Sequence, residues 1–255
     1  MPDVLLYLGF AALLYVLSFV SGMLGLGVAF VAIPVLALFG FDLKTVLMPW
    51  ALLLNGLTAI SAAIAFLRQG MVDLRTAVPL LVITTLAAPI GVYLVGFVPV
   101  DVIWWIYVGV LVFLAYRMSF PPQVGEIEGK TVGDRQRVIA SILGLVIGAF
   151  AGFLGVGPGF LMMPALVLLG YSARTAAATN AVIVTLPSFS AFAGHLGTAQ
   201  FDWILVLVTG AASVVGAMNG ASFMARRVRS RMLSRIFAVV LIGLALQRVY
   251  LQLSS

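Results

Sequence analysis

The chain has 255 residues, of which 63% are hydrophobic and only 9% are charged, and its mean hydropathy is +1.21. This composition excludes an ordinary soluble domain and predicts a polytopic membrane protein, because several apolar runs of about twenty residues contain no charge. The net charge of +6 does not indicate a nucleic-acid partner, since the basic residues lie between apolar runs rather than on a soluble face. Cysteine is absent, which excludes disulfides and cysteine metal sites.

Ten apolar segments follow one another along the chain, and each is expected to be a helix. The second segment has 14 residues, and a helix of that length reaches only about 21 Å, short of a bilayer core of about 30 Å. We therefore expect segments 1 and 2 to form a hairpin with a buried tip, although full crossing by both would leave every later loop on the same side. The segments cover residues 4–21, 27–40, 46–67, 76–96, 102–116, 138–153, 158–170, 175–197, 203–224 and 232–252.

A polar stretch at residues 119–137 divides the chain into near halves. We expect it to be a cytoplasmic linker between a transmembrane repeat at residues 1–118 and a second at residues 138–255. The halves repeat at an offset of 130 residues, with nine identical positions between residues 22–41 and 152–171. Duplication explains this similarity better than convergent glycine-rich turns do.

Basic residues orient the segments, because cytoplasmic loops retain Lys and Arg. Ten alternating segments leave only Lys44 and Arg248 on one side, whereas eight crossings would split the basic residues seven against seven. Five segments per repeat is an odd number, so the second repeat is inverted. The predicted fold class is an all-α polytopic membrane protein, with ten hydrophobic helical segments in two inverted repeats of five, short broken or hairpin helices near the midplane, and both termini periplasmic. The cytoplasmic side receives Arg68, Arg75, Arg117, Lys130, Arg135, Arg137, Arg174, Arg226, Arg227, Arg229, Arg231 and Arg235.

All acidic residues lie in loops or at the edges of segments. A buried Asp or Glu commonly compensates a cation inside the membrane, so its absence favours an anionic or neutral substrate. With one histidine and no buried acid, the sequence lacks the catalytic set of a membrane enzyme and the ligands of a metal site. We expect no enzyme activity and no cofactor. The acidic residues are Asp3, Asp42, Asp73, Asp101, Glu126, Glu128, Asp134 and Asp202.

Glycine-rich turns at the starts of the short segments are candidate anion sites, because backbone N–H groups and the helix dipole favour an anion where a helix begins. Pro158 suits the first position of a helix, whereas Val28 stands there in the first half, so the two tips are not expected to be equivalent. Close helix packing through small residues is the alternative explanation. The candidate glycines are Gly22, Gly25, Gly27, Gly155, Gly157 and Gly159.

Polar side chains lie on the segment that follows each short segment, and their groups can donate hydrogen bonds to an oxyanion. Hydrogen bonding between helices is the alternative for each single residue. Together with the glycines they make up the predicted substrate-binding set. They are Asn55, Thr58, Thr179, Asn180, Thr185 and Ser188.

The run Gly152-Phe-Leu-Gly-Val-Gly-Pro-Gly-Phe-Leu-Met-Met-Pro164, followed by Gly170-Tyr-Ser-Ala-Arg-Thr-Ala-Ala-Ala-Thr-Asn180 and Gly194-His-Leu196, resembles the sulfite exporter TauE/SafE family. The resemblance covers both halves, with Asn180 where the family usually has serine. It implies a secondary transporter that moves sulfite, sulfonates such as sulfoacetate, and related anions across the bacterial inner (cytoplasmic) membrane, frequently outward. The small anion and the lipid bilayer are the expected partners.

Other functions stay open from the sequence. A carrier or channel for another small metabolite and a non-transporting membrane scaffold subunit are both compatible with it. The sequence does not determine the coupling ion, the transport direction or the oligomeric state, and a homodimer is left open.

Overall fold

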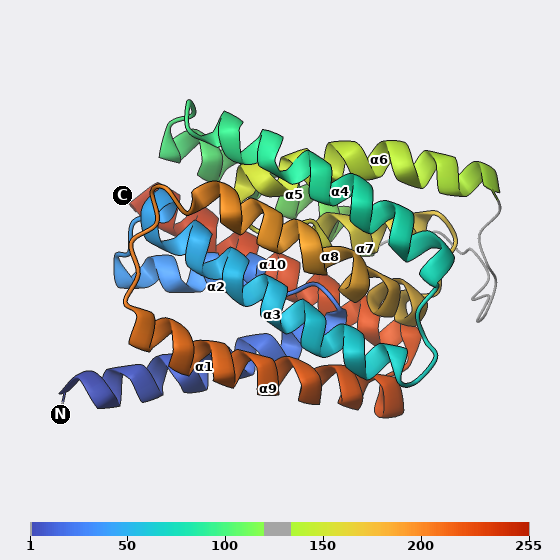
Figure 1. Cartoon of the computed structure of the whole chain (residues 1–255), viewed down its shortest axis with the longest axis horizontal. Helices are drawn as coiled ribbons and strands as arrows, with labels where there is room; N and C mark the ends of the chain where they lie inside the picture. The colour runs from blue at the N-terminus through green and yellow to red at the C-terminus, as the bar shows by residue number, and fades with distance from the viewer. Residues whose placement is uncertain (1, 120–133, 255) are drawn as a thin grey trace.

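The computed structural model describes residues 2–119 and 134–254, so most of the predicted linker at residues 119–137 lies outside the described residues. In the described part, every regular element is a helix, and the ten α-helices follow the order of the ten apolar segments (Figure 1). A 3₁₀ turn at Ala37–Phe39 follows α2, and a π-helical turn at Leu43–Leu47 precedes α3. The α-helices are α1 (Pro2–Leu24), α2 (Ala29–Leu36), α3 (Met48–Leu67), α4 (Leu74–Val95), α5 (Val100–Ser119), α6 (Asp134–Leu154), α7 (Gly159–Leu168), α8 (Ala173–His195), α9 (Trp203–Arg227) and α10 (Ser230–Ser254).

Six of these helices are long and apolar enough to cross a membrane: α1, α3, α4, α8, α9 and α10. Large apolar side chains point outward from the bundle, for example Leu86 and Leu207, which are 73% and 70% exposed. Exposure of that kind on many helices is costly in water but suits contact with lipid. The predicted class, an all-α membrane protein, is confirmed.

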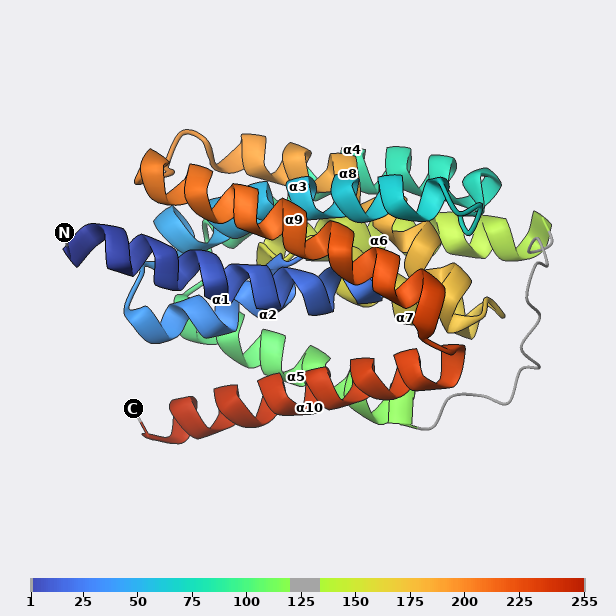
Figure 2. The same cartoon turned by 90° about the horizontal axis from the view of Figure 1, so that it is seen from below.

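Helices α1 and α2 form a hairpin whose turn lies inside the bundle, and α6 and α7 form a second one. Figures 1 and 2 show that α1 and α6 begin at opposite ends of the molecule. Leu26 and Val28 in the first turn have no exposed surface, and Val156 in the second is 1% exposed. The sequence prediction of a hairpin with a buried tip is confirmed.

Each hairpin packs along the fourth helix of the other half, α1 along α9 and α6 along α4. Glycines permit this close approach. A Cβ on Gly220 would lie 1.9 Å from the carbonyl oxygen of Phe19, and one on Gly152 would lie 2.0 Å from that of Ala88. Contacts of small residues are the usual basis of helix packing in membranes, where lipid competes with apolar side chains.

Other helices also pair between the two halves of the chain, since α3 packs against α8 and α5 packs against α10. The main helix pairs α1–α9, α4–α6, α3–α8 and α5–α10 thus each join the two halves of the chain. Both termini lie at one end of the molecule (Figures 1 and 2), and the connections from α3 to α4 and from α9 to α10 lie at the other. Arg68 and Arg229 lie in these connections, and Arg75 lies in the first turn of α4. The charge asymmetry seen in the sequence thus corresponds to two ends of one bundle.

Aspartates cap helices at both ends of the bundle. The Asp42 carboxylate accepts hydrogen bonds from the N–H groups of Lys44 and Thr45, at 3.1 and 2.8 Å. Asp202 caps α9 and also accepts a hydrogen bond from the Tyr7 hydroxyl. This bond is the main cause that lowers the pKa of Asp202, and the hydrogen bond from the N–H of Leu205 is the next. Asp73 caps α4 at the other end of the bundle, and Asp101 lies in the first turn of α5.

The packing of α1 on α9 can be tested at Gly220. A Gly220→Val substitution places a branched side chain against the Phe19 carbonyl, so we expect it to destabilise the protein by about 1–3 kcal/mol, the usual cost of overpacking. Gly243→Val is the control, because nothing lies within 4 Å of a Cβ at Gly243. Thermal unfolding in detergent measures both, and equal stability of the two variants would contradict the described packing.

Candidate functional site

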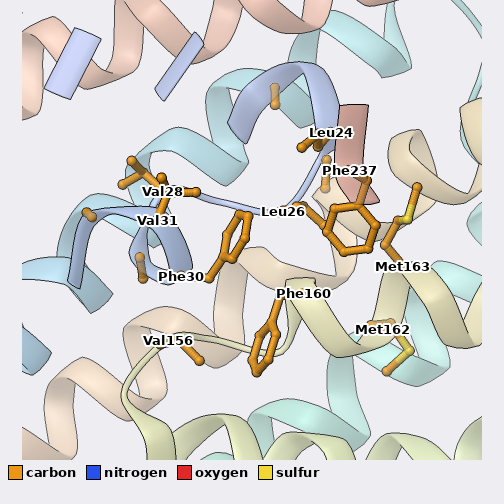
Figure 3. Packing of buried hydrophobic residues seen from close by; sticks show 14 of the residues in the cluster. Leu24, Leu26, Val28, Phe30, Val31, Val156, Phe160, Met162, Met163 and Phe237 are labelled. Carbon is orange, nitrogen blue, oxygen red and sulfur yellow. The ribbon is translucent and has the colours of Figure 1, made fainter. Parts of the chain in front are cut away.

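The tips of the two hairpins meet in the centre of the bundle. Phe30 and Phe160, each the second residue of its short helix, stack with ring centroids 6.3 Å apart and planes inclined by 3° (Figure 3). A Cβ on Gly159 would lie 2.1 Å from the carbonyl oxygen of Leu26. Because both rings are fully buried and α2 and α7 run away from each other, the starts of two helices face one buried region.

Each tip turns through a pair of glycines in the left-handed backbone region. The φ angles are 66° at Gly25 and 75° at Gly27, and 68° at Gly155 and 74° at Gly157. Other L-residues rarely adopt this conformation, so both tips depend on glycine at these positions. The chain therefore follows the same path at the two tips, as the repeat in the sequence predicts.

Side chains of α3 cap the first tip. The N–H of Ala29 donates to Oδ1 of Asn55 at 2.8 Å, and the N–H of Val28 donates to Oγ1 of Thr58 at 3.2 Å. Asn55 also reaches across the bundle, where its Nδ2 donates to Oγ of Ser188 at 2.8 Å. These bonds satisfy N–H groups that the start of a helix otherwise leaves free.

The second tip has no such cap. Thr185 and Ser188 stand 130 residues after the two capping residues of α3, but their hydroxyls donate to carbonyls of their own helix at 2.8 and 2.7 Å. Pro158 has no N–H to donate. Within the described chain, no side chain accepts from the N–H of Gly159. The N–H of Gly159 is therefore a donor without a side-chain cap among the described residues.

Asn180 on α8 connects the two tips. Its Nδ2 donates to the carbonyl oxygens of Gly25, at 2.8 Å, and Gly159, at 2.9 Å. The side chain has no exposed surface, and its Oδ1 has no hydrogen-bond partner among the described residues. One amide thus joins the hairpins and leaves an acceptor beside the start of α7.

Most of the predicted substrate-binding set comes together around this point. The contacts that bring it together are the hydrogen bonds above and the close approach of both tips to Asn55, since Cβ atoms on Gly27 and Gly157 would lie 2.2 and 2.3 Å from its amide. The residues that meet are Gly25, Gly27, Asn55, Thr58, Gly157, Gly159, Asn180 and Ser188.

Four predicted residues have other contacts. A Cβ on Gly22 would lie 2.4 Å from the carbonyl oxygen of Ala217, so Gly22 serves the packing of α1 on α9, and Gly155 packs against a methionine of α3. The Thr179 hydroxyl accepts from a backbone N–H in the turn before α4 at 3.1 Å. The Thr185 hydroxyl bonds within its own helix. Gly22 therefore has the helix-packing role, and Thr179 the hydrogen-bonding role between helices, that the sequence left as alternatives to substrate binding.

Aromatic residues at the tips were not among the predicted site residues. The rings of Phe30 and Phe160 cover the meeting point, and the Tyr107 hydroxyl donates to the carbonyl of Phe30. The sequence contains a sign of their importance, because phenylalanine stands at the same position of both repeats, Phe30 and Phe160. Trp50 corresponds to Asn180 at the 130-residue offset, and its buried Nε1 has no acceptor among the described residues.

Comparison with known proteins identifies the family. The family model for the sulfite exporter TauE/SafE matches residues 10–248. The chain belongs to the sulfite exporter TauE/SafE family. It is therefore a membrane transporter, as the resemblance in the sequence implies, and the scaffold alternative is set aside. No match was found among solved structures.

Curated relatives of this TauE/SafE protein carry concordant names. A probable membrane transporter protein of Haemophilus influenzae is 29% identical over 212 residues, which is 81% of this chain and 80% of the relative. Probable membrane transporter protein YdhB of Bacillus subtilis is 22% identical over 216 residues, 82% of this chain and 87% of the relative. A probable membrane transporter protein of Sinorhizobium sp, ORF9, is 25% identical over 73% of this chain and 71% of the relative.

The role of Asn55 as a cap can be measured as stability. In Asn55→Ala the buried N–H of Ala29 loses its acceptor, so we expect a loss of about 1–3 kcal/mol. Asn219→Ala is the matched control, because Asn219 bonds to the Tyr15 hydroxyl on the exposed surface. Thermal unfolding of the purified transporter in detergent should distinguish the two. A control that loses as much stability as Asn55→Ala would refute the capping role.

Proposed function

We propose that this TauE/SafE protein exports a small organic or inorganic anion, of the sulfite, sulfonate or sulfoacetate type, across the bacterial inner membrane. The observation that carries the proposal is that the starts of α2 and α7 face one buried region. Helix starts carry partial positive charge, and the open N–H groups of α7 are donors for an oxyanion. Export and the sulfur chemistry of the cargo derive from the family.

The distribution of acidic residues supports an anion over a cation. The carboxylates of Asp42, Asp73 and Asp202 cap helices at the ends of the bundle, where each accepts hydrogen bonds from the first N–H groups of its own helix. A cation at the tips would find helix dipoles of unfavourable sign and no carboxylate from the described helices. An anion finds the favourable sign without any buried charged residue.

The tight packing of the tips corresponds to a closed state in this proposal. Phe30 and Phe160 stack on each other, and Asn180 bonds to both hairpins. A solute reaches the N–H of Gly159 only after the tips separate. Because each hairpin is carried on the fourth helix of the other half, movement of one half against the other would expose the site to alternate sides.

Thr185 provides a test of the anion site at α7. In Thr185→Asn the new amide occupies the position that corresponds to Asn55 and can cap Gly159, so we expect flux of sulfite or sulfoacetate in proteoliposomes to fall at least about tenfold. Thr185→Val is the control, because it removes only a hydroxyl that bonds within its own helix, and it should retain flux. Native flux in Thr185→Asn would exclude the α7 start as the anion site.

Orientation in the inner membrane is the second part of the proposal, with both termini periplasmic and the arginine-rich end cytoplasmic. The absence of cysteine permits single-cysteine labelling. Gln69 and Gln200 are both exposed, in turns at opposite ends of the bundle. In intact spheroplasts we expect a membrane-impermeant maleimide to label Gln200→Cys and not Gln69→Cys, with both labelled after lysis. The reverse pattern in intact spheroplasts would invert the orientation.

A further inference from the structure

Asn180 leaves a strong hydrogen-bond acceptor unused. Its Nδ2 donates to the carbonyl oxygens of Gly25 and Gly159, at 2.8 and 2.9 Å. Its Oδ1 is fully buried and has no partner within the described residues. A buried acceptor without a donor is unfavourable, so a bound group that supplies a donor hydrogen is stabilised there.

The orientation of this carboxamide is determined by its neighbours. Rotation by half a turn about the last side-chain bond would place Oδ1 against the carbonyl oxygens of Gly25 and Gly159, which have no hydrogen to donate. The free atom of Asn180 is therefore the oxygen. It belongs to the same planar group as Nδ2, which contacts the first residue of α7, so it lies beside the start of that helix.

The start of α7 thus offers two kinds of hydrogen-bonding group. The N–H of Gly159 is a donor without a side-chain acceptor among the described residues, and Oδ1 of Asn180 is an acceptor without a donor. An anion with only acceptor oxygens satisfies the first group and leaves the second unpaired. An anion that also carries an O–H satisfies both.

We propose that the transported anion is an oxyanion with its own hydrogen-bond donor, a hydroxylated organic sulfonate. This rests on the proposed function, and it narrows the substrate class of that site. The anionic oxygens bind the N–H groups at the start of α7, and the O–H donates to Oδ1 of Asn180. Sites built to pair a substrate hydroxyl discriminate strongly against an analogue that lacks it, because their own polar group is then left unpaired.

Two sulfonates that differ by one hydroxyl test this inference. Binding of 2-hydroxyethanesulfonate and of ethanesulfonate to the full-length protein in detergent, and counterflow of each in proteoliposomes, should favour the hydroxylated anion at least about tenfold. In Asn180→Leu, which has no acceptor, we expect the preference to fall to about onefold. Asn219→Leu makes the same change at an exposed asparagine and should retain the native preference.

The outcomes separate the inference from the proposed function. Equal binding of the two sulfonates to the native protein overturns the inference and leaves anion transport in place. A native preference that persists in Asn180→Leu overturns the assignment to Asn180. If neither sulfonate binds to the protein or is transported by it, both the proposed sulfonate cargo and the inference are overturned. The comparison on the native protein remains decisive if Asn180→Leu does not fold.

Discussion

The pairing of backbone groups at two broken helices inside an apolar bundle is the constraint on which the structure depends. In a bilayer no water reaches such groups, so each free N–H or carbonyl requires a partner from the protein or from a ligand. The first tip obtains its partners from Asn55 and Thr58 on α3, and Asn180 on α8 bonds to carbonyls of both tips. The central helices of the two halves are therefore capping elements as well as spans.

Duplication produced two tips with one backbone path, but the side chains around them have diverged. Pro158 stands opposite Val28 in the repeat, and Thr185 stands opposite Asn55. The first pair removes an N–H and the second removes a cap, so side chains of α3 cap the first tip, whereas no described side chain caps the N–H of Gly159. In the proposed function this difference between the tips gives the carrier one anion site, at the start of α7.

The hairpins make two kinds of contact at different places: glycine contacts with α9 and α4, and side-chain contacts between the tips. The hairpins are held on α9 and α4 through glycines such as Gly220 and Gly152, at contacts that no side chain can enter. The tips meet each other through two phenylalanine rings and the amide of Asn180, and these are the contacts that open in the proposed mechanism. In that mechanism the glycine contacts keep each hairpin on the opposing half, and the solute passes between the tips.

The sequence by itself determined the membrane class, the ten helical segments and the glycine-rich turns, because hydrophobic length, charge placement and glycine content can be read directly from the chain. It favoured a hairpin for the first two segments but left full crossing open, and the tertiary structure decided for the hairpin. The sequence did not separate Asn180 from Thr179, or Gly25 from Gly22, since neighbours of similar type differ only in which helix face meets which partner. The tertiary structure placed Gly22 in a packing contact and Thr179 in a hydrogen bond between helices. It also showed that Asn55 caps the N–H of Ala29, whereas no described side chain caps the N–H of Gly159. Those distinctions depend on contacts between residues more than a hundred positions apart, such as Asn55 with Ser188 and Asn180 with Gly25, which only the folded chain brings together.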